Sequence, residues 1–366
     1  MSYSASTADA SVHVPPPRAD IEPPAPAAHC PDLGAWAFCW RSLVEVSRTF
    51  SKPIEMLSPN LRAATACGYL ICRIADTIED DETLSNRERD ALFAAMLEVL
   101  EDGAAPDTFI QLAAGLSGRP CELRLARNID QVMRVFRALA PQHQKVCVTW
   151  AGEMIRGMGL YARREPGEDG LVLLRTLSDL ERYCYFVAGT VGQMLTGLFL
   201  AEMPDISQAR IRQMRANAED FGLGLQLVNI LKDQTEDLGR GWCFIPQTLW
   251  DTQEMEPRDM LDPAMRSSAH QTVAPVFERA HHCLFNALEF TLGIPPEQVE
   301  MRLFCILPLW MAARTLRHAR GNDAMFIADA PVKISRAEVT ELIAQALESA
   351  GDDPALRAQF AALIDA

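Results

Sequence analysis

The stretch Ala66-Cys-Gly-Tyr-Leu-Ile-Cys-Arg-Ile-Ala-Asp-Thr-Ile-Glu-Asp80 carries a narrow polar stripe on an otherwise apolar helix. Its polar residues follow one another at intervals of 4, 3 and 4 positions, and they are Tyr69, Arg73, Asp76 and Asp80. Residues three or four positions apart share one face of a helix. An ordinary surface helix instead has a wide polar face and one apolar stripe. The pattern therefore predicts a helix whose polar stripe lines an internal cavity.

The same design recurs about 155 residues later, in Gly222-Leu-Gly-Leu-Gln-Leu-Val-Asn-Ile-Leu-Lys-Asp-Gln-Thr-Glu-Asp237. Here the polar residues are spaced by 3, 4 and 4 positions, and they are Gln226, Asn229, Asp233 and Asp237. Leucine, isoleucine and valine occupy the remaining faces up to Leu231. The segment predicts a second helix whose polar stripe faces the same cavity.

Acidic stripes also occur on exposed helices, because a like-charged i,i+4 pair costs only about 0.2–0.5 kcal/mol. One stripe alone is therefore compatible with a solvated face. Two stripes on apolar helices favour a different interpretation, since an ionised carboxylate buried without a partner is far less stable. A hard divalent cation removes that instability, and Mg²⁺ binds one or two carboxylates together with substrate phosphates. The candidate metal ligands are Asp76, Asp80, Asp233 and Asp237.

The two segments also contain basic side chains suited to a phosphorylated substrate. Arg73 and Lys232 can hold phosphate oxygens beside the metal ligands. Ionisation of an allylic diphosphate requires that the leaving negative charge be neutralised. The carbocation left behind requires a dry apolar cavity. The combination of stripes and apolar residues therefore predicts metal-dependent diphosphate chemistry.

The composition narrows the class of protein. Of the 366 residues 49% are hydrophobic and only 7% aromatic, which favours helices over sheets. The formal net charge of −15 argues against a nucleic-acid partner, because phosphate-backbone binding needs a basic surface. The ten cysteines form no CxxC pair, which is typical of reduced structural thiols and predicts a cytoplasmic protein. The seven histidines show no zinc-ligand spacing.

The pattern along the chain predicts one all-α domain over residues 32–366, after a Pro/Ala-rich tail, residues 1–31, that we expect to be disordered. Capping boxes predict helix starts at Ser85, Ser178 and Ser335. The longest apolar run, 304–313, is about half of the roughly 20 residues that a membrane-spanning helix needs. We therefore expect a soluble chain without a spanning segment.

Five stretches resemble, in the right order, the successive motifs of the squalene/phytoene synthase family. They are Ser47-Arg-Thr-Phe50, Tyr69-Leu-Ile-Cys-Arg73, Asp76-Thr-Ile-Glu-Asp80, Tyr183-Cys-Tyr-Phe-Val-Ala-Gly189 and Gln226-Leu-Val-Asn-Ile-Leu-Lys-Asp-Gln-Thr-Glu-Asp237. Two further stretches, Phe304-Cys-Ile-Leu-Pro308 and Ala330-Pro-Val-Lys-Ile334, are more similar to the squalene-forming branch than to the phytoene-forming branch. The resemblance covers most of the chain.

The resemblance implies a class I prenyltransferase fold, an isoprenoid synthase bundle of helices around a central cavity. It implies head-to-head coupling of two farnesyl diphosphates through a cyclopropyl intermediate, presqualene diphosphate, and NADPH-dependent rearrangement to squalene. Mg²⁺ would be held by the four aspartates, and Tyr183 would be a candidate acid or base. By motif position the substrate-binding residues would be Arg48, Phe50, Tyr69, Arg73, Gln226, Asn229, Lys232, Arg240 and Phe304.

The chain departs from the family pattern at three positions. Trp242 stands where an arginine is usual, with Arg240 two residues earlier, Leu309 replaces a glutamine and Ser335 replaces a basic residue. These changes leave open a terpene cyclase, or a coupling enzyme that releases an alcohol or dehydrosqualene without NADPH. A catalytically silent helical scaffold is a third possibility, but it has no use for four aspartates in a cavity. Loose peripheral association with a membrane would allow delivery of an apolar product.

Overall fold

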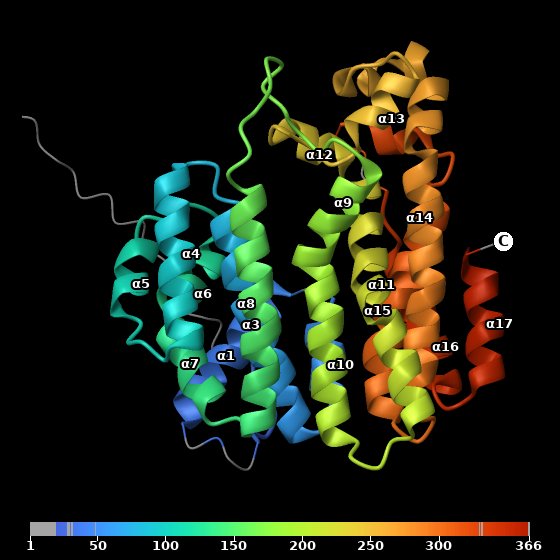
Figure 1. Cartoon of the computed structure of the whole chain (residues 1–366). Helices are drawn as coiled ribbons and strands as arrows, with labels where there is room; N and C mark the ends of the chain where they lie inside the picture. Colours follow the sequence, from blue (N-terminus) through green and yellow to red (C-terminus); the bar gives the residue numbers. More distant parts are fainter. Residues whose placement is uncertain are drawn as a thin grey trace, which may run out of the picture.

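The computed structural model describes residues 20–27, 30, 32–47, 49–328, 330 and 332–364, and these residues form a bundle of helices (Figure 1). The α-helices are α1 (Leu33–Val46), α2 (Ser51–Met56), α3 (Pro59–Glu79), α4 (Asn86–Glu101), α5 (Asp107–Ala113), α6 (Pro120–Arg127), α7 (Ile129–Arg137), α8 (Pro141–Tyr161), α9 (Leu177–Cys184), α10 (Thr190–Glu202), α11 (Gln208–Lys232), α12 (Gln234–Gly239), α13 (Gln247–Thr252), α14 (Arg266–Gly293), α15 (Val299–Ala319), α16 (Arg336–Ser349) and α17 (Asp353–Ile364). A π-helical turn, η1 (Tyr185–Gly189), joins α9 to α10, and three short 3₁₀ turns are η2 (Pro257–Leu261), η3 (Pro263–Met265) and η4 (Asp323–Phe326). The predicted all-α fold is confirmed.

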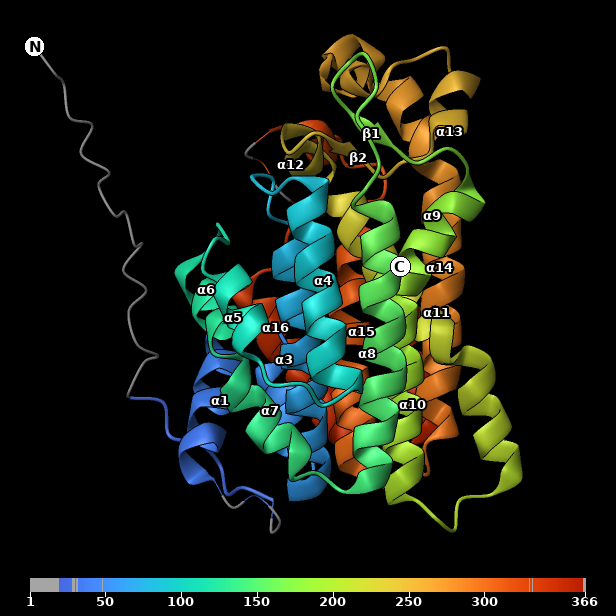
Figure 2. The ribbon, with the colours of Figure 1, turned by 60° about the vertical axis from the view of Figure 1, so that its left-hand side comes forward.

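The long helices α3, α8, α10, α11, α14 and α15 run along one common direction (Figures 1 and 2). Helix α11 packs against α10, α14 and α15, while α3 packs against α1, α7 and α8. Helix α10 lies between these two groups and contacts both α3 and α11. Helices from distant parts of the sequence thereby come to surround one interior space.

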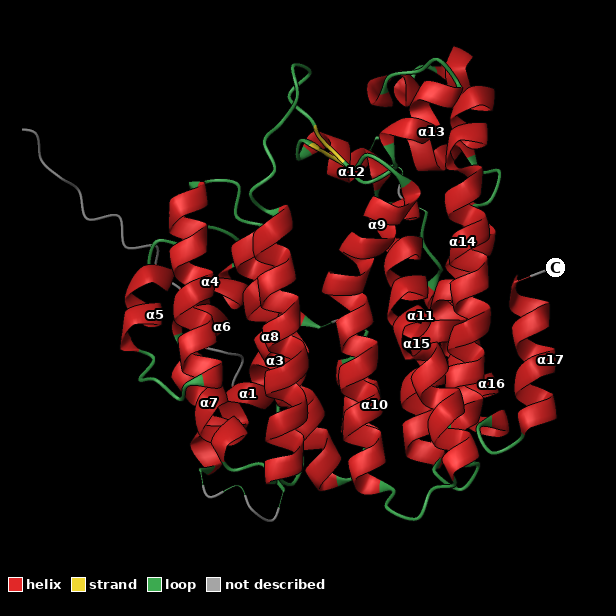
Figure 3. Ribbon diagram, in the orientation of Figure 1, coloured by secondary structure: helices red, strands yellow, loops and turns green. Residues whose placement is uncertain are grey.

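Among the described residues, the strand pairing is confined to two very short segments near one end of the bundle (Figure 3). Strand β1 (Val172–Leu173) pairs in parallel with β2 (Trp242–Cys243), and Val172 lies opposite Trp242. The Val172 N–H donates to the carbonyl of Gly241 at 2.8 Å. This pairing fixes the backbone that carries Trp242 beside the end of α12.

Two of the three predicted helix starts are confirmed, at Ser85 and Ser335. In each, the serine hydroxyl accepts from the backbone N–H of the glutamate three residues later, and the glutamate carboxylate accepts from the serine backbone N–H. The predicted start at Ser178 is wrong. Helix α9 begins at Leu177, and the Thr176 hydroxyl accepts from the backbone N–H of Asp179 at 3.2 Å. Thr176 has the extended backbone that a capping residue requires, whereas Ser178 already lies inside the helix.

The second polar stripe does not lie on one continuous helix, so that part of the prediction is wrong. Helix α11 ends at Lys232, and Asp233 has φ −105° and ψ 12°, outside the helical region. Helix α12 begins at Gln234, and the N–H of Asp237 still donates to the carbonyl of Asp233 at 2.9 Å. The two aspartates therefore stay one turn apart, although the helix axis is interrupted between them.

A further expectation, that no segment has the length of a membrane span, is also wrong. The helical run Leu177–Glu202, which comprises α9, η1 and α10, is long and apolar enough by length and composition, since an 18-residue window within it has a mean hydropathy of 1.4. Glycine, threonine and glutamine interrupt the apolar residues of this segment, so a search for the longest uninterrupted apolar run does not find it. In the structure it packs against α8 and α11 as part of the bundle.

Part of the predicted tail lies along α1. The Trp36 Nε1–H donates to the carbonyl of Pro24 at 2.8 Å, and Arg41 Nε donates to the carbonyl of Ile21 at 3.1 Å. Residues 1–19 lie outside the described residues, so the disorder expected for them stays a prediction.

Helix α11 approaches α10 and η1 closely through two glycines that also line the interior cavity. A Cβ atom on Gly222 would lie 2.0 Å from the carbonyl oxygen of Ala188, and one on Gly192 would lie 1.8 Å from that of Ala218. Both contacts are with backbone, which cannot move aside as a flexible side chain can. These two positions therefore require glycine.

We expect Gly222→Ala to lower the free energy of unfolding by about 1–3 kcal/mol, because the added methyl group forces η1 and α11 apart. Gly239→Ala is the matched control, since nothing lies within 4 Å of its added Cβ. Urea unfolding followed by circular dichroism checks both variants. Equal stabilities would show that the helix contact can relax without loss.

Candidate active site

The interior of the bundle contains an apolar cavity of about 1030 Å³ that opens into a polar mouth of about 1720 Å³. Arg73, Asp76, Val187, Gln226 and Asn229 line both spaces, so the two are continuous. The apolar part is enclosed by α2, α3, α8, η1, α10, α11 and α15. A ligand with a polar head and a long apolar tail could occupy both parts at once.

Thirteen of the fourteen site residues expected from the sequence line one or other of these spaces. Those at the mouth are Arg73, Asp76, Asp80, Tyr183, Gln226, Asn229, Lys232, Asp233, Asp237 and Arg240. Phe50, Tyr69 and Phe304 line the apolar part. The fourteenth, Arg48, lies outside the described residues.

Helix α3 supplies one wall of the mouth, as its stripe predicts. Arg73 Nη2 donates to the Tyr69 hydroxyl at 3.2 Å, and Arg73 Nη1 lies 3.4 Å from Asp76 Oδ2. Asp80 ends the helix as its capping residue and pairs with Arg240, at 2.5 Å between Nη2 and Oδ1. The α3 stripe therefore meets the segment that follows α12, which is 160 positions away in the sequence.

Helices α11 and α12 supply the opposite wall. Gln226 and Asn229 lie deepest, where the mouth meets the apolar cavity. Lys232 forms an ion pair with the adjacent Asp233, and Asp237 follows one turn later. The two carboxylate stripes, predicted separately, thus border one space.

The mouth carries five carboxylates and four basic side chains among the described residues. They are Asp76, Glu79, Asp80, Asp233 and Asp237, with Arg73, Arg119, Lys232 and Arg240. The sequence reasoning missed Glu79 and Arg119. Glu79 lies inside the quoted α3 motif but off its spaced stripe, and Arg119 lies just before α6, where it pairs with Glu122 at 3.1 Å. No spacing signal connects Arg119 to either stripe.

Burial and mutual repulsion raise the pKa values of these carboxyl groups. Burial, opposed by Arg73 and reinforced by Asp80, raises the pKa of Asp76 to about 6. Burial and the charge of Asp233 raise the pKa of Asp237 to about 7. Burial and the neighbouring aspartates also hold the pKa of Glu79 well above its usual range. The ionised forms of these three carboxyl groups are therefore disfavoured, and a bound cation would stabilise them.

A hard divalent cation fits this donor set. Within the described part of the chain, no three His, Cys, Asp or Glu side chains lie close enough to hold one ion by themselves. Mg²⁺ does not need such a cluster, because it commonly binds one or two carboxylates, waters and substrate phosphates. The mouth offers carboxylate and amide oxygens, which suit a hard cation bound together with a diphosphate.

An aromatic stack covers one side of the mouth. Trp242 stacks on Phe244, with centroids 5.3 Å apart and an interplanar angle of 15°, and Phe244 stacks on Tyr183 at 4.9 Å and 24°. Tyr161 contacts Tyr183 edge-on at 5.2 Å. Burial and the nearby Glu79 raise the pKa of Tyr183 well above its usual value, so the phenol stays protonated. The sequence gives no signal for Phe244, because its place in the site depends on stacking against Tyr183, which lies in a distant segment.

The backbone beside Tyr183 is unusual. Tyr185–Gly189 form a π-helical turn, a feature that occurs frequently at functional sites. Val187 and Ala188 of this turn line the apolar cavity, and Phe186 packs over Gly157 of α8. Because a π-helical turn has more residues than an α-helical turn, it changes which side chains of this segment face the cavity.

Aromatic rings also close the apolar part. Phe50 contacts Tyr69 at 5.9 Å and Phe304 at 6.3 Å between centroids, and Phe199 contacts Phe304 edge-on at 5.9 Å. Leu309 is fully buried in α15 and does not line either space. Its replacement of glutamine therefore changes the core of α15 rather than the cavity wall.

The squalene/phytoene synthase family matches residues 43–338, which span both carboxylate stripes and the apolar cavity. The chain belongs to the squalene/phytoene synthase family. This membership confirms the resemblance carried by the five motifs.

Relatives within the family include the squalene synthase of Cyberlindnera jadinii, 28% identical over 306 residues, which cover 83% of this chain and 66% of the relative. The squalene synthase of Saccharomyces cerevisiae is 29% identical over 291 residues, covering 78% of this chain and 61% of the relative. The chain thus spans less than two-thirds of the length of these relatives.

Solved structures share the fold. A complex of TcSQS with a ligand has a TM-score of 0.74 and 24% identity, and the match covers 89% of this chain and 91% of that chain. A ligand-bound dehydrosqualene synthase has a TM-score of 0.58 and 18% identity, with 86% and 95% coverage. Squalene synthase HpnC from Alicyclobacillus acidocaldarius has a TM-score of 0.52 and 19% identity, with 78% and 94% coverage.

Proposed function

We propose that the protein is a farnesyl-diphosphate farnesyltransferase that couples two farnesyl diphosphates head-to-head to squalene through presqualene diphosphate. The observation that carries the proposal is the continuity of a carboxylate-lined mouth with an apolar cavity of about 1030 Å³. Such a shape suits a substrate with a charged head and long hydrocarbon tails. The squalene synthases among its relatives support the same reaction.

In this proposal Asp76, Asp80, Asp233 and Asp237 hold Mg²⁺, which supplies neutralisation of the leaving diphosphate. Arg73, Lys232 and Arg240 hold diphosphate oxygens, as the basic side chains nearest to those aspartates. Their charges favour departure of the diphosphate because they stabilise the negative charge that develops on it.

The remaining residues control the carbocation. The Tyr183 phenol stays protonated and lies at the mouth, so it can orient a leaving oxygen or exchange a proton at the reacting carbon. Phe50, Tyr69 and Phe304 exclude water from the hydrocarbon chain and present aromatic faces to positive charge. Gln226 and Asn229 mark the boundary between the polar and apolar parts.

Product analysis tests the proposal. The purified protein is incubated with farnesyl or geranylgeranyl diphosphate and Mg²⁺, with and without NADPH, and the products are separated by gas chromatography with mass spectrometry. We expect squalene from farnesyl diphosphate only when NADPH is present. Absence of any pyrophosphate release would instead favour a scaffold.

Trp242 favours a second candidate, a non-reductive coupling enzyme or a terpene cyclase. An indole lines the mouth where the family usually has a guanidinium, and it continues the stack over Tyr183. An alcohol, dehydrosqualene or a cyclic terpene formed equally with and without NADPH would identify this activity.

We predict that Trp242→Arg lowers the Michaelis constant for farnesyl diphosphate by about tenfold or shifts the products towards squalene, because a guanidinium adds a charge-assisted hydrogen bond at the mouth. Steady-state kinetics and product analysis measure both effects. Thermal unfolding serves as the control for loss of the stack. A stable variant with unchanged kinetics and products would show that Trp242 has no part in substrate handling.

We further propose a cytoplasmic protein that associates peripherally with membranes to release its apolar product. All ten cysteines are free, which is typical of a reducing compartment. Fractionation without detergent should recover most of the protein in the supernatant. Any protein that sediments with membrane vesicles should be released from them by salt or by dilution.

A further inference from the structure

Three of the four motif aspartates already pair with a basic side chain of the same chain. Arg73 pairs with Asp76 at 3.4 Å, Lys232 pairs with Asp233, and Arg240 pairs with Asp80 at 2.5 Å. The first two pairs join near neighbours in the sequence. Only the Arg240 pair connects the two walls of the mouth, since it joins the end of α3 to the residue that follows α12.

Arg240 is well placed to change partners. Its side chain is 39% exposed, and its Nε also lies 3.5 Å from Glu82 Oε1. It stands between Gly239 and Gly241, and Gly241 has a φ of +78°, which favours glycine. The same arginine lines the mouth beside Asp237 and Trp242.

A guanidinium and a divalent cation compete for one carboxylate. A Mg²⁺ ion held by Asp80 would repel the positive charge of Arg240 and would leave its guanidinium free to bind another anion. A diphosphate held at the same mouth would be a stronger partner for this guanidinium than Glu82, because a guanidinium binds phosphate oxygens with two parallel hydrogen bonds.

We infer that Arg240 pairs with Asp80 in the unliganded protein and binds the diphosphate when Mg²⁺ occupies Asp80. This change of partner makes Mg²⁺ and diphosphate bind cooperatively. The inference rests on the proposed function for the location of the metal and the diphosphate. It predicts that removal of the Arg240 charge has opposite effects on the binding of Mg²⁺ alone and on the binding of pyrophosphate. Mg²⁺ alone should bind more tightly, because Asp80 is freed, whereas pyrophosphate in the presence of Mg²⁺ should bind more weakly.

Isothermal titration calorimetry with Mg²⁺ alone, inorganic pyrophosphate alone, and pyrophosphate in saturating Mg²⁺ tests this on the full chain. In Arg240→Gln we expect Mg²⁺ to bind about two- to fivefold more tightly, the fold-change that corresponds to an exposed ion pair. Pyrophosphate in Mg²⁺ should bind at least about tenfold more weakly, as for loss of a charge-assisted hydrogen bond. Arg240→Lys should restore part of the cooperativity.

The matched control is Arg163→Gln, which removes an exposed arginine that pairs with Asp90 at 2.8 Å outside the mouth. It should leave all three titrations unchanged. If Arg240→Gln weakens Mg²⁺ and pyrophosphate alike, or leaves pyrophosphate binding unchanged, the inference is overturned. None of these titrations depends on whether the protein couples two farnesyl diphosphates. A cooperative site that yields no squalene would therefore refute only the proposed function.

Discussion

Replacement of Asp76 by asparagine is expected to lower the rate of pyrophosphate release from farnesyl diphosphate by at least about 10²–10³-fold. The asparagine has the same shape but carries no charge, so it binds Mg²⁺ poorly. Asp76 lines both the mouth and the apolar cavity, where the reacting carbon would lie in the proposed complex. A coupled pyrophosphate assay at saturating Mg²⁺ measures the rate.

The fold should not change in this variant. Burial, reinforced by the charge of Asp80 and opposed by Arg73, raises the pKa of Asp76, so the ionised form is disfavoured there. Circular dichroism and the unfolding midpoint of the metal-free protein should therefore be unchanged or slightly higher. Asp233→Asn should behave in the same way, while Asp90→Asn, at an exposed pair outside the mouth, should keep full activity. Near-normal turnover in Asp76→Asn would refute the assignment of the metal ligands.

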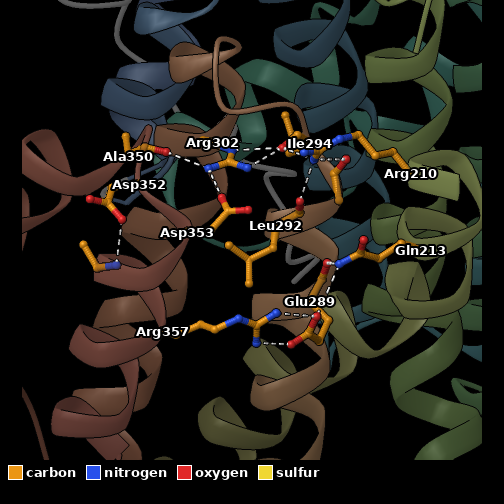
Figure 4. A network of polar contacts seen from close by, with 12 residues as sticks. Arg210, Gln213, Glu289, Leu292, Ile294, Arg302, Ala350, Asp352, Asp353 and Arg357 are labelled. Atoms are coloured by element: carbon orange, nitrogen blue, oxygen red, sulfur yellow. Dashed lines mark hydrogen bonds and ion pairs between the residues drawn. The ribbon is translucent and has the colours of Figure 1, made fainter. Parts of the chain in front are cut away.

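The second large effect is expected at Arg302, which lies in the network that joins the end of α14 to α15 and α17 (Figure 4). Its side chain is completely buried. Nε and Nη2 donate to the carbonyl of Ile294 at 2.9 and 2.7 Å, and Nη1 donates to the carbonyl of Ala350 at 3.1 Å. Nη1 also lies 2.7 Å from Asp353 Oδ1.

Arg302→Met is expected to lower the free energy of unfolding by about 3–5 kcal/mol, because it leaves buried carbonyls and the Asp353 carboxylate without their donor. Chemical denaturation measures the change. Arg320→Met is the matched control, since its pair with Glu278 is exposed and should contribute less than about 1 kcal/mol. A loss below about 1 kcal/mol in Arg302→Met would show that α16 and α17 do not depend on this network.

The neighbouring contacts explain why the loss should be cooperative. Arg210 of α11 donates to the carbonyl of Leu292 at 2.9 Å and to that of Ile294 at 3.2 Å. Arg357 of α17 forms a two-point ion pair with Glu289 of α14. Three arginines from three helices thus converge on the last turn of α14 (Figure 4). Such positive charge also suits the negative end of a helix.

Much of the candidate site could be predicted because its signal is local. The spacing of Tyr69, Arg73 and Asp76 depends only on the helical period, and α3 preserves it without a break. The Ser85 and Ser335 capping boxes involve residues three positions apart, and both are present. The order of the motifs along the chain can likewise be seen without the folded structure, and this order indicates the family.

The failures have a common physical origin in contacts between distant segments. The break at Asp233 and the π-helical turn at Tyr185–Gly189 leave the local apolar pattern unchanged, so spacing alone does not reveal them. Arg302 reads as an ordinary helix arginine, because one of its partners, Ala350, is 48 positions away. Glu79 and Arg119 become part of the mouth only when α3 and the start of α6 are placed beside α11.

The helical class, the two carboxylate stripes and the family follow from the amino-acid sequence alone, because helical periodicity and motif order depend on residues that lie close together along the chain. That the stripes border one mouth, that Arg240 pairs with Asp80, and that Trp242 stacks through Phe244 onto Tyr183 became clear only in the folded protein. These arrangements depend on how helices pack around the apolar cavity. Packing is decided by the shapes of many side chains together and not by the spacing within one segment.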